Sequence, residues 1–386
     1  MKILYYSTAY YAAHGGSIQS KEFYKNLSYI PGVEAAIFPK KISSGRITNS
    51  NGSWKRTLKN NRAFMPLSFY RRNQFYWNEL LFKIEGFQPD VLIIQIDANF
   101  LQISRLRKLF PNLFICAQIN GSVFDEIYQK IIFRKYFLKL QQESYLASDL
   151  NLFISEPSRT TIMRDSIDQN RDRIIYNGTN LEQFFPLTNK SGLKSRLNFP
   201  EDKFIVGYVG TLDRHKKMEI LLKAFQMIIG EKVNIHLVIL GDGPGLSELK
   251  ESINAMKIQD HVSLPGWVSH EEMNQYLNCF DLAIHHYAND YMNPLKIFEY
   301  LAVGIPVIAP DIPSVRRIFR DGEDLIISKG NHKNLQLEML TLIEDVNLRR
   351  KLANNLELRE RLEKDFTWKA YARKVYEAIE NQMHEG

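Results

Sequence analysis

The chain has 386 residues, of which 45% are hydrophobic and 12% aromatic. This length exceeds one ordinary globular core, so we expect two or three domains. No apolar run reaches the roughly 18 residues of a membrane-spanning helix, and the first residues do not follow the order of a signal peptide. With only Cys116 and Cys279, the sequence supports neither a disulfide framework nor a cysteine-built metal site. We therefore expect a cytoplasmic globular protein.

Positive charge is concentrated in the first half of the chain. Residues 1–186 contain 24 Lys and Arg against 15 Asp and Glu, whereas the remaining residues contain 26 against 28. A basic half can face nucleic acid, an anionic membrane or an acidic acceptor. Nucleic acid is disfavoured as a partner, because the sequence has no helix-turn-helix, zinc-finger or RNP-type pattern.

The first half alternates buried strands with amphipathic helices, which predicts a mostly parallel sheet that binds ligands at the carboxyl ends of its strands. The predicted strands are residues 2–7, 33–38, 91–96, 113–118, 150–154 and 173–176, and the predicted helices are residues 19–27, 74–86, 101–110, 127–146 and 157–164.

A polar, basic tract at residues 42–61 interrupts this alternation and leads into the apolar, aromatic and basic segment 64–72. Such a region can lie on an anionic membrane surface, which would place the protein at the inner face of the membrane. A solvated loop with a packed return is the alternative. Both interpretations stay open.

The second half repeats the alternation after a linker at about residues 187–200. We predict strands at residues 204–209, 234–240, 261–264, 282–285, 307–309 and 325–327, followed by a final helix at residues 368–382.

The segment 293–309 is the most informative part of the sequence, because it predicts a loop, a helix and a buried strand in succession. Pro294 suits the first helical turn, and Gly304-Ile305-Pro306 ends the helix before the apolar strand. A loop that enters a helix offers free backbone amides and the positive end of a dipole. Phosphate binds readily at such a place.

Lys296 adds a positive charge to the first turn of this helix, and Glu299 follows one turn later on the same face. A cation for phosphates with a carboxylate for sugar hydroxyls suits a nucleotide-sugar site. An ordinary surface ion pair is the competing interpretation.

Three segments precede this one: G-Y-V-G-T-L-D-R-H-K-K at residues 207–217, G-D-G-P at 241–244 and L-P-G-W-V-S at 264–269. In this order and spacing, the four segments resemble the C-terminal half of a GT-B glycosyltransferase. The family is the large retaining group 1, or family 4, which includes sucrose synthases and bacterial mannosyl- and glucosyltransferases. The resemblance is strongest over residues 204–310.

The resemblance implies an α/β fold of the GT-B type, with two Rossmann-like doubly wound domains facing across a cleft. Residues 1–186 would form the N-terminal acceptor-binding domain, and residues 187–365 would form the nucleotide-sugar-binding domain. The C-terminal helix, residues 366–386, would cross back and pack on the first domain.

The family binds the donor diphosphate with the Arg and Lys of a G-R-L-x-x-x-K-G turn. Here Lys216 falls at the Lys position, Thr211 replaces the Arg, and Arg214 is the residue that could compensate. The backbone amides of Leu295 and Lys296 would hold the phosphate. Exposed loop charges are the alternative for Lys216 and Arg214.

The family's E-x7-E signature is half present. Glu299 matches the second Glu, which binds the ribose hydroxyls, but Tyr291 stands at the first position with Asp290 beside it. By the same resemblance, Trp267 and Val268 would border the nucleobase, although a buried core Trp remains an alternative.

Two sites in the first domain complete the implied donor site. Gly15 and Gly16 would let the backbone approach the diphosphate or the transferred sugar. Asn120 stands where many members have a His near the reacting centre, and its amide cannot take a proton at neutral pH. Glu156 belongs to a Ser-Glu pair that we interpret as a helix cap.

The resemblance implies a retaining, metal-independent hexosyltransferase with Asn120, Lys216 and Glu299 as its catalytic residues. It would move a sugar from a nucleotide-diphosphate sugar to a glycan or lipid-linked acceptor, in cell-surface polysaccharide or glycoconjugate synthesis. The donor is a co-substrate, so no cofactor is expected. His285 and His286 are adjacent, but no third metal ligand has suitable spacing.

The departures at Tyr291, Thr211 and Asn120 leave a second hypothesis open, a non-catalytic nucleotide-sugar-binding partner subunit of a glycosyltransferase. A GT-B epimerase is disfavoured because the resemblance runs to transferases throughout. A nicotinamide dehydrogenase is disfavoured because no G-x-G-x-x-G follows the first strand.

Overall fold

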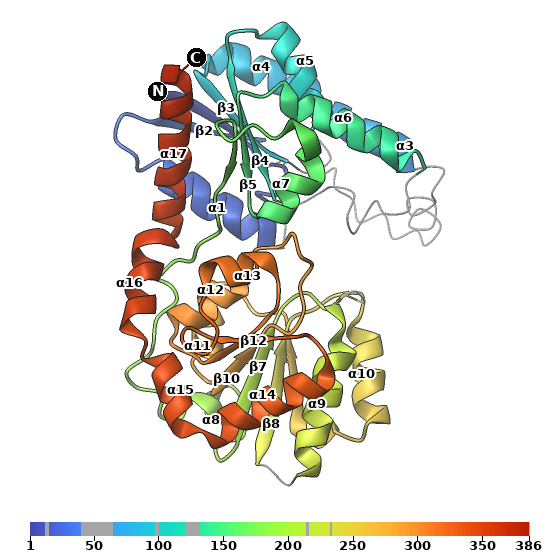
Figure 1. Cartoon of the computed structure of the whole chain (residues 1–386), viewed down its shortest axis with the longest axis vertical. Helices are drawn as coiled ribbons and strands as arrows, with labels where there is room; N and C mark the ends of the chain where they lie inside the picture. Colours follow the sequence, from blue (N-terminus) through green and yellow to red (C-terminus); the bar gives the residue numbers. More distant parts are fainter. Residues whose placement is uncertain are drawn as a thin grey trace. The chain divides into compact units, whose positions relative to one another are not determined.

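The computed structural model describes residues 1–11, 15–39, 65–96, 100–120, 132–213, 216–231 and 234–385. The chain divides into two compact units, each built on its own parallel sheet (Figure 1). The first unit comprises Met1–Tyr176 and Trp368–Gly386, and the second comprises Asn177–Thr367. The boundary between the two units therefore falls after Tyr176, whereas the sequence analysis placed the domain boundary after residue 186.

The first unit contains a six-stranded parallel sheet in the order β2-β1-β3-β4-β5-β6. Its strands are β1 (Lys2–Tyr6), β2 (Glu34–Phe38), β3 (Val91–Ile96), β4 (Phe114–Ile119), β5 (Leu150–Phe153) and β6 (Asp172–Ile174). All six residues of β3 are buried, as expected for an apolar run with helices on both faces of the sheet. The chain adds strands outward from β1 to β2 on one side and from β3 to β6 on the other, so the strand order reverses between β1 and β3.

The helices of the first unit mostly follow the predicted ones. They are α1 (Gly15–Leu27), α3 (Met65–Phe75), α4 (Trp77–Phe87), α5 (Leu101–Leu109), α6 (Arg134–Leu146), α7 (Glu156–Met163) and α17 (Trp368–Glu385). The helix predicted at residues 74–86 corresponds to α4, which begins three residues later because a turn at Tyr76 separates it from α3. The tract 42–61 lies outside the described residues.

The C-terminal helix α17 returns to the first unit and packs along α1 (Figure 1). Tyr5 in β1 donates its hydroxyl to Gln118 Oε1 at 2.9 Å, and Gln118 Nε2 donates to the hydroxyl of Tyr371 in α17 at 2.8 Å. The rings of Phe23 in α1 and Tyr371 in α17 pack edge to face, with their centroids 5.6 Å apart. Buried hydrogen bonds of this kind join β1, β4 and α17, and the predicted return of the C-terminal helix is confirmed.

The second unit repeats this architecture with the strand order β12-β11-β10-β7-β8-β9, again parallel. Its strands are β7 (Phe204–Val209), β8 (Ile235–Leu240), β9 (Val262–Gly266), β10 (Leu282–Ile284), β11 (Val307–Pro310) and β12 (Ile326–Ser328). The winding reverses between β7 and β10. In doubly wound sheets, ligands bind beyond the carboxyl ends of the strands at such a reversal.

The helices of the second unit cover both faces of this sheet. They are α8 (Leu193–Arg196), α9 (Met218–Gly230), α10 (Leu246–Ala255), α11 (Met273–Leu277), α12 (Leu295–Ala302), α13 (Pro313–Ile318), α14 (His332–Glu344), α15 (Val346–Ala353) and α16 (Leu356–Asp365). The short helix α8 lies in the segment that the sequence analysis assigned to a linker.

In the first unit, the predicted capping at Glu156 is confirmed, because Ser155 before it accepts a hydrogen bond from the Ser158 amide at the start of α7.

Candidate functional site

Three loops meet at the carboxyl edge of the second sheet, after β7, β8 and β9. The Leu212 amide donates to the Asp242 carbonyl at 3.0 Å, and the Gly241 amide donates to the Gly266 carbonyl at 2.8 Å. Gly241 has φ of +148°, and a Cβ placed on it would lie 1.9 Å from the Gly210 carbonyl oxygen. Only glycine fits there, so the loops form one bonded platform.

Lys216 lies in the loop between β7 and α9, and the end of β10 holds this loop. His286 Nε2 lies 3.1 Å from the carbonyl oxygens of both Lys216 and Lys217. Carbonyls only accept hydrogen bonds, so Nε2 carries the proton and His286 is a donor. Burial lowers the pKa of His286 to about 4, which keeps the ring neutral at physiological pH.

The pKa of His285 is affected by the charged groups near the point where the strand order reverses. Its pKa is lowered to about 3, first by burial and then by Lys216, His286 and Lys296. A lysine from the β7–α9 loop and a lysine from the start of α12 therefore act on one buried imidazole. Lys216 follows β7 and Lys296 follows β10, so both lie beyond the carboxyl edge of the sheet. Among the described residues, no group of three His, Cys, Asp or Glu side chains is placed to hold a metal ion.

The loop that enters α12 is fixed at both sides. The Asn177 amide donates to Asn293 Oδ1 at 2.7 Å, and Ser314 Oγ donates to the Met292 carbonyl at 2.6 Å. Pro294 caps the helix with an extended backbone and does not lie within its first turn. Leu295 and Lys296 are the first helical residues. Amides at this end of a helix have no carbonyl partner one turn earlier, so they point outward to ligands.

Glu299 is buried in α12, with 3% of its side chain exposed. Lys296 Nζ lies 2.7 Å from one carboxylate oxygen, and His270 Nε2 lies 3.7 Å from the other. Burial alone would raise the pKa of Glu299, but Lys296 and His270 outweigh burial and hold that pKa below its usual value. The sequence-predicted pair is therefore a part-buried, charged pair and not a solvated surface ion pair.

The other residues predicted for the donor site differ in their exposure. Trp267, directly after β9, is 67% exposed, so the interpretation as a buried core Trp is wrong. Val268 is half-buried and Asp290 is exposed. Tyr291, at the position of the missing Glu, accepts a hydrogen bond from Asn289 Nδ2 at 3.1 Å. Arg214 lies outside the described residues.

The first unit has a second cluster at its own reversal point. Gly15 and Gly16 begin α1, and the Gly16 carbonyl accepts a hydrogen bond from Ser20 Oγ at 2.7 Å. Asn120, directly after β4, donates its side-chain amide to Gln19 in the first turns of α1. The structure therefore places Asn120 against the helix that Gly15 and Gly16 begin. Sequence reasoning missed Gln19, because a polar residue on a helix carries no signal of its own.

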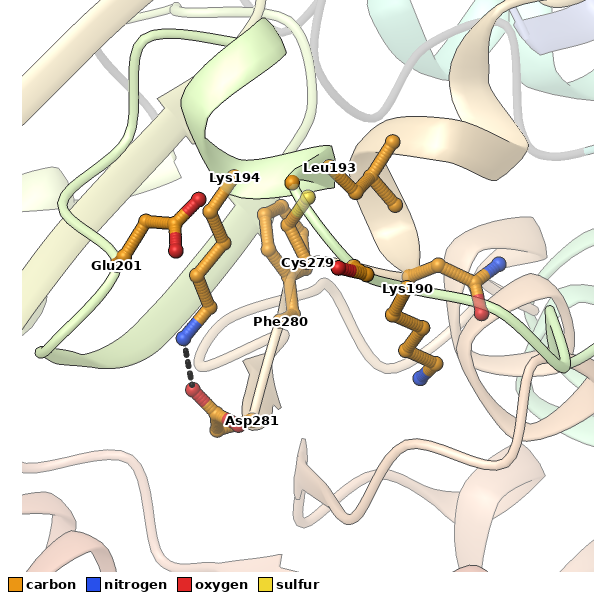
Figure 2. A pocket seen from close by; sticks show the side chains of 10 residues that line it. Lys190, Leu193, Lys194, Glu201, Cys279, Phe280 and Asp281 are labelled. Carbon is orange, nitrogen blue, oxygen red and sulfur yellow. Dashed lines mark hydrogen bonds and ion pairs between the residues drawn. The ribbon is translucent and has the colours of Figure 1, made fainter.

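A pocket in the second unit lies at the opposite edge of the sheet (Figure 2). Lys194 Nζ pairs there with Asp281 Oδ2 at 3.3 Å, and the same oxygen accepts the Ile205 amide at the start of β7. Because Asp281 immediately precedes β10, this pocket adjoins the amino ends of the strands. Its position separates it from Lys216 and Glu299, which follow the carboxyl ends.

Part of the chain matches a known sequence family. Residues 189–359 match the family described as Glycosyl transferases group 1, and the recognition of that family is confirmed. The alpha-monoglucosyldiacylglycerol synthase of Streptococcus pneumoniae is 28% identical over 181 residues, which cover 45% of this chain and 41% of that protein. The chain spans about half the length of the curated relatives it matches, from 40% to 57% for three of them.

Solved structures share the fold over the whole chain. Sucrose-phosphate synthase of Thermosynechococcus elongatus has a TM-score of 0.77 and 19% identity, with 100% of both chains covered. HepE of Anabaena in complex with UDP has a TM-score of 0.74 and 16% identity, with 99% of this chain and 100% of that chain covered. The predicted α/β fold of the GT-B type is confirmed.

Proposed function

Because residues 189–359 belong to the Glycosyl transferases group 1 family and the chain has the GT-B fold, we propose that the protein is a hexosyltransferase. It uses a nucleotide-diphosphate sugar as donor and a glycan or lipid-linked molecule as acceptor. The observation that carries this proposal is the buried Glu299, held by Lys296 in the first turns of α12. A buried carboxylate beside an anion site suits a ligand that presents both hydroxyls and phosphates.

The donor lies across the β7–β10 reversal of the second unit. Lys216 and Lys296 contact its diphosphate, together with the amides of Leu295 and Lys296. Glu299 accepts hydrogen bonds from the ribose hydroxyls, and the exposed Trp267 and the half-buried Val268 border the base. The solved structure of HepE contains UDP, which is a ligand of this chemical class.

The reaction proceeds with retention of the anomeric configuration. The acceptor oxygen forms a bond to the anomeric carbon on the face from which the diphosphate departs, and a phosphate oxygen takes the acceptor proton. The leaving group gains negative charge, which Lys216 and Lys296 stabilise without a metal ion. Asn120 of the first unit does not act as a base, because its amide is not basic.

The acceptor is a lipid-linked glycan or a glycolipid at an anionic membrane surface. The relative from Streptococcus pneumoniae is named for a glycolipid product. No helix among the described residues is both long and apolar enough to span a bilayer. An acceptor in a membrane requires a surface of the protein that binds at the lipid headgroups.

The helices α3 and α6 supply such a surface. They lie side by side, with the rings of Tyr70 and Phe137 6.0 Å apart (Figure 1). Exposed aromatic and basic side chains are interspersed on them, as membrane-surface helices require. These residues, defined here as the α3–α6 surface, are Leu67, Tyr70, Arg71, Phe133, Arg134, Lys135, Tyr136 and Lys139.

A second candidate is the non-catalytic nucleotide-sugar-binding partner subunit. Tyr291 favours it, because this phenol, bonded to Asn289, stands where the family has a carboxylate near the donor sugar. Tight nucleotide binding without turnover, even with lipid extracts as acceptor, would identify this function.

The test is a calorimetric screen of UDP, GDP and ADP, followed by transfer assays with the corresponding sugars. We expect one nucleotide to bind and its sugar to be transferred with retention, in EDTA as well as without it. Failure of all three nucleotides to bind would overturn the proposed donor class. Transfer that EDTA abolishes and manganese restores would overturn the metal-free mechanism.

A further inference from the structure

His270 lies against two separate parts of the second unit, the turn that contains Gln183 and Phe184 and the helix α12, and the donor site assigned above does not use it. It follows β9 in the loop that contains Trp267, and 23% of its side chain is exposed. Its Nε2 atom is inaccessible to solvent and has no partner within hydrogen-bond distance among the described residues. A buried polar atom without a partner is unfavourable and marks a place that needs a physical explanation.

Gln183 determines which nitrogen of His270 carries the proton. The side-chain nitrogen of Gln183 contacts the His270 carbonyl oxygen and lies 2.9 Å from His270 Nδ1. A carbonyl oxygen can only accept, so the Gln183 atom that faces it is the amide NH2 group. The same group donates to Nδ1, which must then be unprotonated. In the neutral ring the proton is on Nε2.

This Nε2–H group faces Glu299. The distance from Nε2 to the carboxylate Oε1 is 3.7 Å, while Lys296 Nζ lies 2.7 Å from the other oxygen. The His270 ring is held in place by the edge of Phe184, whose centroid is 5.2 Å away and whose side chain is 1% exposed. Gln183 therefore sets the tautomer, and Phe184 helps to set the ring plane.

The segment that carries Gln183 and Phe184 is itself fixed. The amides of both residues donate to the Asn180 carbonyl, at 3.2 and 2.8 Å. This turn precedes the segment, at about residues 187–200, that the sequence analysis assigned to a linker. The turn therefore contributes to the candidate donor site through His270.

We propose that His270 is a positioning residue for ribose recognition: its Nε2–H group, directed by Gln183, orients the Glu299 carboxylate toward the ribose hydroxyls of the donor. This inference rests on the proposed function. Lys296 alone would hold one oxygen and leave the carboxylate free to turn about its own axis. An N–H group 3.7 Å from the other oxygen attracts it electrostatically and favours one plane of the carboxylate, so that the remaining lone pairs point in defined directions.

The binding experiment measures the affinities of UDP, GDP and ADP and of their 2′-deoxy counterparts by calorimetry. We expect the wild type to prefer the ribose form of its nucleotide by about tenfold, because one hydrogen bond to a charged group is lost in the deoxy form. His270→Phe retains a ring against Phe184 but removes Nε2–H, so the ribose preference should fall to about twofold. His270→Gln returns an amide donor and should restore part of it.

The double variant separates a positioning role from direct contact with the nucleotide. In the Glu299→Ala background, the further change His270→Phe should leave affinity for the ribose form unchanged, because His270 acts through the carboxylate. An equal loss in both backgrounds would overturn the proposal. His332→Phe, a change at the start of α14, is the matched control and should leave the preference of the wild type intact.

Nitrogen NMR of the imidazole rings tests the tautomer without any nucleotide. The His270 signals, assigned by their loss in His270→Phe, should show protonated Nε2 and unprotonated Nδ1. Protonated Nδ1 in the neutral ring would overturn the proposal even if nucleotides bind. If the wild type binds none of the three nucleotides, the proposed function fails and the ribose role fails with it. Binding with no change of preference in His270→Phe overturns the role of His270 alone.

Discussion

The two units share one architecture but differ in the side chains at their reversal points. In the second unit, Lys216, Lys296 and Glu299 bring full charges to the edge of the sheet after β7 and β10. In the first unit, the bonded groups are hydroxyls and amides. The Ser7 hydroxyl lies 2.9 Å from Ser20 Oγ, and Gln95 Nε2 lies 3.3 Å from Gln19 Oε1.

This difference assigns different chemistry to the two sheets. Charged side chains discriminate phosphate from neutral groups, since they supply Coulomb attraction in a partly buried site. Hydroxyls and amides both donate and accept, which suits neutral hydroxyl groups. The same fold therefore carries charged groups in one unit and neutral polar groups in the other, through the residues that follow its strands.

The platform after β7 to β9 should be the most sensitive part of the second unit. Gly241→Ala places a Cβ against the Gly210 carbonyl at a φ that alanine rarely adopts. We expect a loss of about 3 kcal/mol or more in the free energy of unfolding, with loss of nucleotide binding. Chemical denaturation measures it.

Gly230→Ala is the matched control for that change. Gly230 ends α9, and no heavy atom lies within 4 Å of the Cβ that would be added. We expect it to be neutral or to stabilise by about 0.5 kcal/mol. Equal destabilisation by both substitutions would mean that the close approach of Gly241 to the Gly210 carbonyl does not determine the stability of the platform.

The charges of the second unit should govern nucleotide affinity. Lys216→Ala and Glu299→Ala each remove a charged partner from the candidate site, which costs roughly 1.5–3 kcal/mol, or about ten- to hundredfold in affinity. Calorimetry with nucleoside diphosphates measures it. Lys223→Ala, an exposed change on α9, should have no effect. Wild-type affinity in both site variants would refute the assignment.

Acid should destabilise the second unit, because its buried histidines bind protons more readily in the unfolded state. Burial lowers the pKa of His236 and His286 to about 4 and that of His285 to about 3. The unfolded chain binds protons near the ordinary value of about 6.5. Between these values the unfolded state holds more protons, so stability falls as pH drops from about 6.5 toward 4, by up to about 1.4 kcal/mol per pH unit for each ring.

Protonation of Glu299 should also lower the stability of the second unit, at a lower pH. Its folded pKa is depressed, so the stability it contributes is present above its unfolded pKa and is lost as pH falls through the folded value. Hydrogen exchange at pH 7.5 and 5.5 should show greater loss of protection in the second unit than in the first. His236→Gln keeps a donor 2.8 Å from Ser263 Oγ and should reduce the loss. Equal losses in both units would contradict this prediction.

The neutral site of the first unit should respond to hydrogen bonding and not to basicity. Asn120→Ala should lower turnover several-fold, whereas Asn120→His, which can also donate one hydrogen bond, should be tolerated. Turnover and melting temperature measured on the same variants separate catalysis from folding. Unchanged turnover in Asn120→Ala would remove this residue from the site.

The smallest effect is expected at the α3–α6 surface. Replacing Tyr70 and Tyr136 by Ser should weaken sedimentation with vesicles rich in phosphatidylglycerol by a few-fold, without affecting nucleotide affinity. Tyr29→Ser, a change of another exposed tyrosine of the first unit, is the control. Equal sedimentation of all three proteins would exclude this surface from membrane contact.

Local patterns in the sequence determined the two alternating halves, most strand positions and the family. Apolar runs of strand length and the loop–helix–strand segment 293–309 depend on neighbouring residues, so they are visible without a structure. Lys216 and Glu299 were predicted from motif spacing, and the structure places Lys296 and Glu299 in contact.

Contacts between distant residues were decided only by the tertiary structure. Gln183, His270 and Glu299 come from a turn, a loop and a helix that no sequence period connects. The exposure of Trp267 and the neutrality of His285 likewise depend on what surrounds each side chain. Burial and the choice of partner are properties of packing, so the sequence identified the carboxylate, whereas the structure revealed which groups orient it.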